Sequence, residues 1–189
     1  MDYIKAYEDH YRNNGRLGAG GGDGKTKVTR WKKAGFVDGM SILDYGCGCG
    51  AILEGIEDKS QYLGVDIVSQ AIEYARLDYP ECTFKVFTPG TLKTPKKQFI
   101  GAGSVFTHTA RDLVEQSIKD IKQAMNKDSL GIIDILEGDS NNNTIHLAYW
   151  NLQEFAELLL SHGIGSVQID KVKHPNGFTH TYLAIAYDH

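Results

Sequence analysis

The sequence predicts an α/β protein built on a mostly parallel sheet with helices on both faces, and three observations carry this prediction. Short apolar runs alternate with helical segments over most of the 189 residues, which is typical of parallel strands joined by right-handed crossovers. A glycine-rich turn, LDYGCGCGA, links one apolar run to a helical segment. Two later apolar runs flank a Pro-Asn-Gly turn, and so tight a turn forces the strands on either side to pair antiparallel.

Two N-terminal helices come first in the expected order. Their apolar residues recur at helical spacing over residues 2–13 and 26–37, with a loop between them. In the second helix Trp31 and Phe36 should be buried. Together with their loop, these helices form residues 1–37 of a single domain that covers residues 1–189, and the core of the domain is expected at 38–189.

The alternating region makes up that core. Its strands are short apolar runs bounded by turn residues, expected at residues 41–45, 61–66, 82–87, 103–109 and 130–136. The helices between and after them are expected at residues 50–57, 69–79, 110–126 and 151–162, with Ser69 as a capping candidate. Two last strands, at residues 167–174 and 178–187, complete the set. The predicted fold is a three-layer α/β/α sandwich around a mostly parallel seven-stranded sheet with an antiparallel C-terminal strand.

Composition limits the classes of function. The chain has 41% hydrophobic and 23% charged residues and a net charge of −4, which argues against duplex nucleic acid as the main partner. The three cysteines, Cys47, Cys49 and Cys82, fit neither a disulfide framework nor a zinc spacing, so we expect no metal and a reducing cytoplasmic setting. The acidic N-terminal segment does not resemble a signal peptide, and no apolar stretch is long enough to span a membrane.

The first glycine-rich stretch, GAGGGDGKT at residues 18–26, only partly matches a phosphate-binding loop. Such a loop needs a glycine where this sequence has Ala19, and Asp23 would place a carboxylate inside an anion site. The stretch also follows a polar segment instead of a buried strand. Two interpretations stay open: a flexible connector between helices, or a lid that closes over a cofactor.

The second glycine-rich stretch has the context of a nucleotide-binding turn. Gly46, Gly48 and Ala51 meet the spacing G-x-G-x-x-[GA] between a strand and an expected helix, and Asp66 lies 20 positions beyond Gly46 at the end of the next strand. A carboxylate in that place can accept hydrogen bonds from both hydroxyls of a ribose. Ligands in such sheets bind at the carboxyl ends of the strands, which here lie near Gly46, Asp66, Thr88 and Thr107.

Asp44 favours one kind of cofactor over another. It stands two residues before Gly46, and a carboxylate there would repel the pyrophosphate of a dinucleotide. It would attract the sulfonium or the α-amino group of S-adenosylmethionine.

At this point the residues resemble a known family. SILDYGCGCGAIL resembles motif I of the class I S-adenosylmethionine-dependent methyltransferases, and YLGVDIVSQAIEYAR resembles the segment that follows it. SVFTHTARDLVEQSIKDIKQAMNKDSLGIIDI resembles a later region of the family, and the likeness spans roughly residues 30–187. The resemblance implies that Gly46–Gly50 lie along the methionine moiety, that Asp66 holds the ribose and that Ile67 packs on the adenine.

The sequence departs from the family at the adenine. Family members often have an aspartate after the third strand, and FTPGTL has none, so Thr88 or a backbone group would have to contact the adenine amine. The expected cofactor-binding set is Asp44, Gly46, Cys47, Gly48, Gly50, Asp66, Ile67, Thr88 and Thr107.

Methyl transfer requires alignment of the acceptor, and a general base only when the acceptor must lose a proton. His108, after the fourth expected strand, is the candidate for a base or an orienting residue; a capping or packing histidine is the alternative. Residues that could line the acceptor site, each with a structural role as the alternative, are Glu137, Asp139, His146, Tyr149, Trp150 and His180. Tyrosines share one face of the first helix and could close over the cofactor or pack in the core: Tyr3, Tyr7 and Tyr11.

The function expected from the sequence is S-adenosylmethionine-dependent methyl transfer to a small-molecule acceptor, because no inserted substrate domain is evident. Three alternatives remain. They are a protein or RNA methyltransferase, a non-catalytic S-adenosylmethionine-binding partner subunit, and an NAD-dependent oxidoreductase.

Overall fold

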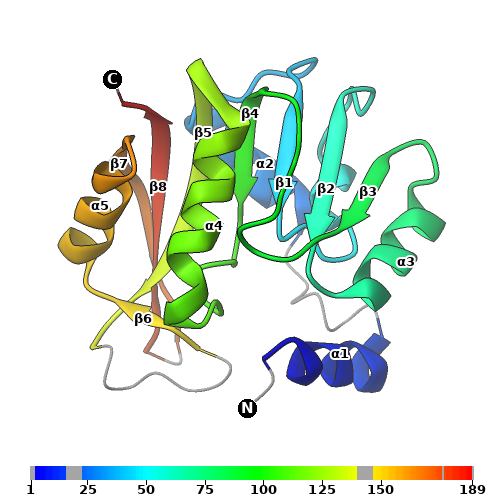
Figure 1. Cartoon of the computed structure of the whole chain (residues 1–189), viewed down its shortest axis with the longest axis horizontal. Coiled ribbons are helices and arrows are strands. Elements are labelled where there is room, and N and C mark those ends of the chain that lie inside the picture. Colours follow the sequence, from blue (N-terminus) through cyan, green and yellow to red (C-terminus); the bar gives the residue numbers. More distant parts are fainter. Residues whose placement is uncertain (1–2, 16–22, 140–146, 176, 189) are drawn as a thin grey trace.

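The computed structural model describes residues 3–15, 23–139, 147–175 and 177–188. Its centre is an eight-stranded sheet in the order β3-β2-β1-β4-β5-β8-β7, with β6 paired to β5 off this path (Figure 1). The strands are β1 (Ile42–Tyr45), β2 (Tyr62–Asp66), β3 (Thr83–Val86), β4 (Lys97–Ala102), β5 (Met125–Glu137), β6 (Tyr149–Trp150), β7 (Ile164–Lys173) and β8 (Thr179–Tyr187). The helices are α1 (Tyr3–Asn14), α2 (Gly24–Lys33), the 3₁₀ turn η2 (Ala51–Glu54), α3 (Ser69–Asp78), α4 (Arg111–Ala124) and α5 (Leu152–Ser161).

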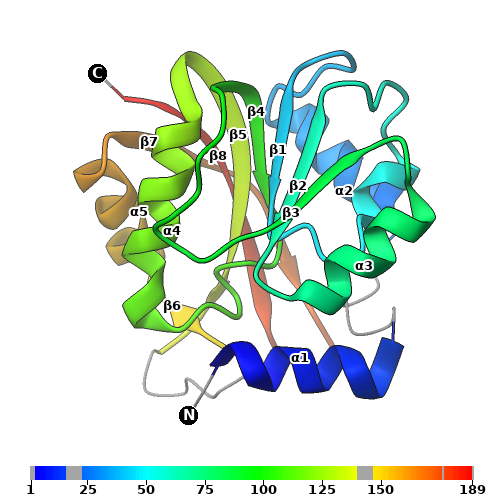
Figure 2. The ribbon, with the colours of Figure 1, turned by 45° about the vertical axis from the view of Figure 1, so that its right-hand side comes forward.

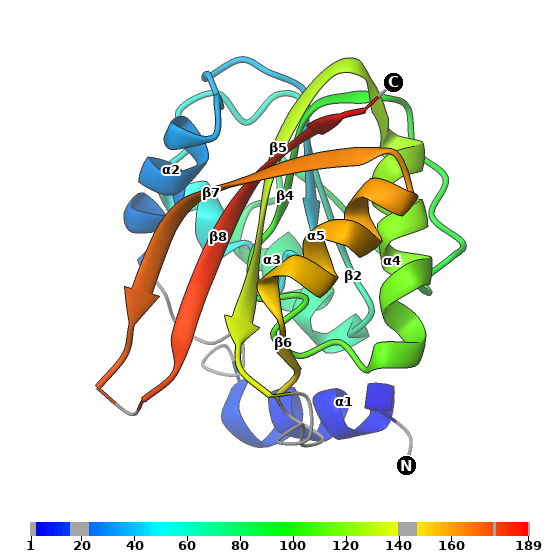
Figure 3. The same cartoon turned by 90° about the vertical axis from the view of Figure 1, so that its left-hand side faces the viewer.

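Helices cover both faces of the sheet, as predicted, and make a three-layer sandwich (Figure 3). On one face α2, η2 and α3 pack on the sheet through a core that includes Val28, Trp31, Leu53 and Ile72. On the other face α4 and α5 pack through a second core with members such as Ile118 and Phe155. Residues on β1 alternate between the two cores, since Ile42 belongs to the first and Leu43 to the second.

The carboxyl ends of β1 and β4 mark the point where the strand order reverses. From β1 the chain builds outward through β2 to β3, and it then returns to the other side of β1 with β4 and β5. The crossovers on the two sides therefore leave in opposite directions, and a crevice opens between them. Helix α1 lies across this end of the sheet (Figure 2).

The antiparallel strand of the prediction is confirmed, and its place in the sheet is now defined. β8 pairs antiparallel with β5 from Leu130↔Ala186 to Glu137↔Thr179, and antiparallel with β7 on its other side. β8 is therefore an inner strand and β7 forms the edge. The two-residue strand β6, which the sequence analysis did not predict, adds a short parallel pairing to the end of β5.

The fourth strand lies earlier than predicted. It covers Lys97–Ala102, whereas residues 103–109 form a turn. Ser104 has a positive φ of 60°, a conformation that a strand does not contain. The hydroxyls of Thr107 and Thr109 donate to the carbonyls of Ser104 and Val105 at 2.9 and 2.8 Å. These local bonds satisfy the polar groups that a strand would have paired with a neighbour.

The helix predicted at residues 50–57 is also wrong in kind. Only the four-residue 3₁₀ turn η2 forms there, because Gly50 before it has a φ of +78° and Gly55 closes it by donating to the carbonyl of Ile52 at 3.0 Å. Ser69 is the first residue of α3, and its predicted capping role is not seen. The position before the helix belongs to Val68.

Helix α2 docks directly on the sheet. It ends at Lys33 and not at 37 as predicted, but Trp31 and Phe36 are both buried, as expected. Trp31 lies against the backbone of Gly101 on β4, where an added Cβ would stand 2.0 Å from the indole ring. A glycine is therefore needed at residue 101 for α2 to approach this closely. In the described ranges no helix combines the length and apolar character required to cross a membrane.

Candidate functional site

A cavity of about 720 Å³ lies at the carboxyl ends of the strands. Its walls come from α1 and α2, from the glycine-rich turn after β1, from the end of β2, from the turn after β4 and from β5 and β8. Of the predicted site residues, the lining includes Asp44, Gly46, Cys47, Gly48, Asp66, Ile67 and His108. The structure thus brings together residues that lie on three strand ends.

The glycine-rich turn is held by the end of β2. Gly46, Gly48 and Gly50 all have positive φ values, between 54° and 78°, which glycine adopts without strain. The N–H groups of Gly46 and Cys47 both donate to the carbonyl of Val65, at 2.8 and 3.0 Å. The N–H of Gly48 donates to Oδ2 of Asp66 at 2.9 Å. The N–H groups of Gly46, Cys47, Gly48 and Gly50 are therefore already used inside the protein.

Asp66 has a structural role in addition to the predicted one. Its Oδ1 accepts a hydrogen bond from the N–H of Val68 at 2.9 Å, while Oδ2 accepts from Gly48. The carboxyl group is only 8% exposed, and burial raises its pKa despite these two bonds. Each oxygen keeps a second lone pair, so the group can still accept hydrogen bonds from a ligand in the cavity.

Asp44 is a second buried carboxyl group on the neighbouring strand. The hydroxyl of Tyr62 donates to its Oδ2 at 2.6 Å. Burial raises the pKa of Asp44 to about 6, although the bond from Tyr62 and the charge of Lys27 act in the opposite direction. A cationic ligand beside this group would favour its charged form.

These observations test which cofactor the site fits. A pyrophosphate needs free N–H donors, but four N–H groups of the turn are used and two carboxyl groups lie beside it. A sulfonium or ammonium cation suits the same surroundings. The residues therefore fit S-adenosylmethionine and do not fit a dinucleotide. The four-residue turn η2 also offers no helix N-terminus for a phosphate.

Helix α1 closes one side of the cavity. Tyr7 and Tyr11 both line it, and Tyr11 is only 5% exposed. The ring of Tyr7 packs edge-on at 6.2 Å from that of His108. The predicted catalytic residue, which belongs to the turn after β4, therefore lies against α1. The side chain of Tyr3 and residues 16–22, which include most of the proposed lid, lie outside the described residues.

Three predicted cofactor-binding residues are not part of the cavity lining. Thr107 is fully buried, Thr88 is exposed, and Gly50 faces Leu53 and Tyr79. Phe87 and Pro89 line the cavity on either side of Thr88.

The buried Asp120 of α4 holds the segment that contains Phe87 and Pro89. It accepts hydrogen bonds from the N–H groups of Gly90 and Leu92 at 2.7 and 3.1 Å. The hydroxyl of Tyr45 donates to the same carboxylate at 3.2 Å, so the end of β1 and the segment after β3 are fixed to one side chain.

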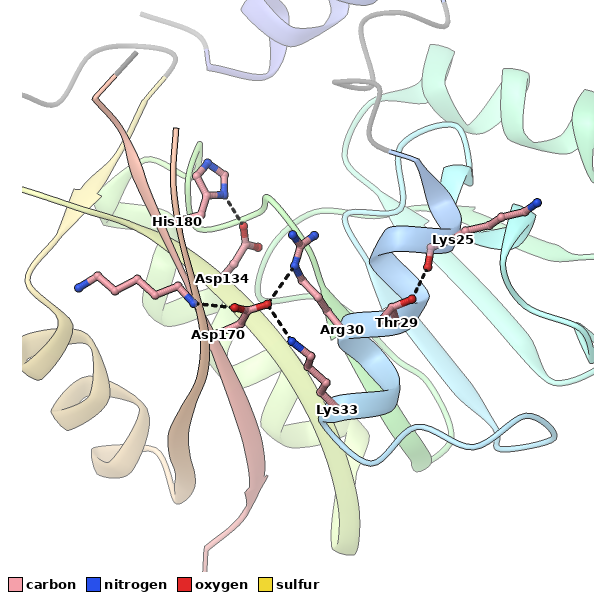
Figure 4. A network of polar contacts seen from close by, with 8 residues as sticks. Lys25, Thr29, Arg30, Lys33, Asp134, Asp170 and His180 are labelled. Carbon is pink, nitrogen blue, oxygen red and sulfur yellow. Dashed lines mark hydrogen bonds and ion pairs between the residues drawn. The ribbon is translucent and has the colours of Figure 1, made fainter. Parts of the chain in front are cut away.

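The cavity also has a polar region that the sequence analysis did not assemble (Figure 4). Its residues are Arg30 of α2, Asp134 of β5, His174 after β7, and His180 and Tyr182 of β8. The carboxylate of Asp134 is buried and lies 3.1 Å from Nδ1 of His180. One signal was present in the sequence, because Asp134 interrupts the apolar run LGIIDIL, and a charged residue inside a buried strand needs a partner.

The remaining candidate residues have structural roles, do not line the cavity, or lie outside the described residues. Glu137 pairs with Lys171 and Thr181, and these hydrogen bonds lower its pKa against the effect of burial. Trp150 is buried and donates to the carbonyl of Phe106 at 3.2 Å. His146 lies outside the described residues. Asp139 and Tyr149 are not among the lining residues of the cavity. Burial raises the pKa of the Cys47 thiol, which keeps this thiol protonated.

Comparison with known proteins gives a consistent result. A family model described as a methyltransferase domain matches residues 42–142. No curated protein matches the chain at a significant level.

Solved structures similar to this chain include a TehB-like SAM-dependent methyltransferase from Corynebacterium glutamicum, at 23% identity and a TM-score of 0.65 over 95% of this chain and 98% of that one. The magnesium protoporphyrin IX methyltransferase of Synechocystis, solved with bound SAM, has 14% identity and a TM-score of 0.69 over 100% of this chain and 98% of that one. The CcbJ methyltransferase of Streptomyces caelestis has 10% identity and a TM-score of 0.73 over 100% of both chains. At these identities the likeness shows the fold.

Proposed function

Because the chain belongs to the methyltransferase domain family, with the class I Rossmann-like fold and S-adenosylmethionine as its cofactor, we propose that it transfers a methyl group to a small-molecule acceptor. The observation that carries the proposal is the set of acceptors around the glycine-rich turn. Four N–H groups of the turn are used internally, and the carboxyl groups of Asp44 and Asp66 border the cavity.

Each of these groups has a distinct task. Asp66 accepts hydrogen bonds from the ribose hydroxyls and holds Gly48 in place. Asp44 lies beside the cationic part of the cofactor, the sulfonium or the α-amino group. Bound in this way, the cofactor supplies a methyl group activated by its positively charged sulfur.

The size of the cavity supports a small acceptor. Its volume of about 720 Å³ lies within the range of roughly 300–1,000 Å³ that small-molecule sites occupy. Helix α1 and its tyrosines border it, which limits the access of water. His108 lies on this side of the cavity, where it orients the acceptor or receives its proton.

Binding calorimetry tests the cofactor first. S-adenosylmethionine and S-adenosylhomocysteine should bind at micromolar concentration, whereas NAD and ATP should not. Failure of the first two to bind, or binding of NAD, would contradict the assignment. Formation of S-adenosylhomocysteine with pools of small acceptors then tests catalysis, and turnover with protein or RNA alone would replace the small acceptor by a macromolecule.

Replacement of His108 by glutamine tests its role. The variant should bind S-adenosylhomocysteine normally and lose about 10²-fold in kcat, the scale of a misplaced reacting group. An unchanged kcat would leave His108 with packing alone.

A further inference from the structure

Arg30 shares the carboxylate of Asp170 with a second cation. Its Nε lies 3.6 Å from Oδ2 of Asp170, and Nζ of Lys33 lies 3.3 Å from the same oxygen (Figure 4). One carboxylate therefore serves two cations. In Figure 4 the two terminal nitrogens of Arg30 point away from Asp170.

Two buried nitrogen atoms in this region have no hydrogen-bond partner among the described residues. They are Nε of Arg30 and Nε2 of His174, and both residues line the cavity. Buried polar atoms are normally paired. The guanidinium lies over the ring of Tyr182 at 4.5 Å, and the ring of His174 lies 4.8 Å from that of His180. Because Arg30 lines the cavity and its terminal nitrogens point away from Asp170, those nitrogens are the donors that Arg30 offers to a ligand.

His180 presents a different chemistry. Its Nδ1 lies 3.1 Å from Oδ2 of Asp134, and Oδ1 of Asp134 accepts the N–H of Ser104 at 2.5 Å. Because a carboxylate only accepts, Nδ1 carries the proton of the neutral imidazole and Nε2 is left as an acceptor. A buried carboxylate behind the ring also stabilises the imidazolium that forms when Nε2 takes a proton.

We propose that the methyl acceptor is a small carboxylic acid that also carries an ionisable hydroxyl or thiol group. Arg30 binds the carboxylate, and His180 takes the proton of the group that is methylated. This inference rests on the proposed function and names the substrate class of that same site. It assigns the proton to His180 and leaves His108 with the orientation of the acceptor.

The step balances as follows. The O–H or S–H bond of the acceptor breaks and its proton passes to Nε2 of His180. The electron pair left on the oxygen or sulfur forms the bond to the methyl carbon, and the pair of the broken carbon–sulfur bond stays on the sulfur of the cofactor. Asp134 holds the charged imidazole until the proton leaves for solvent.

The first test compares acids with their neutral amides. Protein saturated with S-adenosylhomocysteine is titrated with thioglycolate, 3-hydroxybenzoate and 4-hydroxyphenylacetate, and with the amide of each. At least one acid should bind about tenfold or more tightly than its amide, since an Arg–carboxylate pair is among the strong hydrogen-bonded contacts. No preference for any acid would overturn the proposal.

Two variants give this test a matched control. Arg30→Gln should abolish the preference for the acid. Lys33→Gln removes the other cation that pairs with Asp170, but Lys33 does not line the cavity. This second variant should keep the preference within about threefold, as expected for an exposed ion pair. Equal losses in both variants would mean a general charge effect and would refute a site at Arg30. Unchanged affinity for S-adenosylhomocysteine confirms that both variants fold.

The role of His180 is tested by nitrogen NMR of the imidazole rings. In the protein with S-adenosylhomocysteine, Nδ1 of His180 should be protonated and Nε2 not. The bound hydroxy acid should shift the Nε2 resonance, and the matching methoxy acid, which has no proton to share, should not. A protonated Nε2 with an unprotonated Nδ1, or equal shifts from both acids, would refute the assignment.

The same titrations separate the two levels of the argument. If the unmodified protein does not bind S-adenosylhomocysteine, the proposed function is contradicted. Normal binding of S-adenosylhomocysteine without preference for any acid would overturn the inference alone.

Discussion

Asp44 combines a cost in stability with a role in binding. Its pKa is 3.8 in an unfolded chain and about 6 in the folded protein, so the folded state holds more protons between these pH values. The free energy of unfolding therefore falls as the pH rises through this window and stays lower above it. The carboxyl group that attracts a cationic ligand thus weakens the empty protein at neutral pH.

Replacement of Asp44 by asparagine should separate these effects. Asparagine still accepts the hydrogen bond from Tyr62 but carries no charge. At pH 7.5 the free energy of unfolding should rise by about 1–3 kcal/mol, up to the size of the pKa shift, and the gain should shrink towards pH 4. Urea unfolding at the two pH values measures this, and calorimetry should show at least about tenfold weaker binding of S-adenosylmethionine. A variant less stable than the parent at pH 7.5 would contradict the account.

Replacement of Asp66 should lower both the affinity for the cofactor and the free energy of unfolding. Replacement by alanine removes the acceptor for Gly48 and Val68 as well as the contact to the ribose. S-adenosylhomocysteine should bind about 10- to 100-fold more weakly, equivalent to about 1.5–3 kcal/mol for bonds to a charged group, and the free energy of unfolding should also fall. Asp58→Ala, which affects an exposed turn at Ser60, is the matched control. Full affinity in Asp66→Ala would refute the ribose assignment.

Single residues of this site differ in how far the sequence reveals them. Asp44 and Asp66 are readable because each ends or nearly ends a short buried strand beside a glycine turn. The grouping of Arg30, Asp134 and His180 is not readable, because Arg30 lies more than a hundred residues before the other two. The three meet only through the docking of α2 and the register of β5 against β8. No local pattern encodes that register.

At the scale of elements, the contact between α2 and β4 can be tested directly. Gly101→Ala would place a methyl group 2.0 Å from the indole of Trp31, whereas a Cβ on the neighbouring Gly103 meets nothing within 4 Å. The first change should lower the free energy of unfolding by about 1–3 kcal/mol or more, the usual cost of overpacking. The second should leave it within about 0.5 kcal/mol, as at an open surface position. Denaturant unfolding of the two variants compares them, and equal stabilities would refute the close docking.

Element boundaries were predicted well where one pattern dominates. β1, β2, β3 and α3 begin and end within a few residues of their predicted positions. β4 was missed because its apolar core is short and follows the lysines at 93, 96 and 97, while the more apolar run after it is turned by local hydroxyl–carbonyl bonds. The turn η2 was taken for a helix because Ile52, Leu53 and Ile56 are buried as a helix would bury them. The positive φ of Gly50 prevents a longer helix, and the apolar pattern does not encode it.

For the whole molecule, cofactor binding and folding are linked. A ligand that binds only the folded state at 100 times its dissociation constant adds about 2.7 kcal/mol to the free energy of unfolding. In a chain of 189 residues that corresponds to a rise of about 5–10 °C in melting temperature. Thermal unfolding with S-adenosylhomocysteine should show this rise and with ATP should not. A melting temperature that does not respond to S-adenosylhomocysteine would contradict a cofactor site in the folded state.

The layered architecture follows from the alternating pattern of the chain. So does the placement of the glycine-rich turn at the carboxyl ends of the strands, and both were predicted. The position of β8 inside the sheet was not, because a tight turn fixes only the pairing of β8 with β7 and leaves open which of them meets β5.

The inner position of β8 has a consequence for the order in which the protein acquires its abilities during synthesis. In the main path of the sheet β7 is bonded to β8 alone (Figure 3), so a nascent chain that has emerged only as far as β7 has no docking place for that strand. The glycine turn, Asp44 and Asp66 have by then already been synthesised. His180 and Tyr182 arrive with the last strand. A ribosome-bound chain paused before β8 should therefore lack the proposed site for the acid, and insertion of the final strand would complete that site.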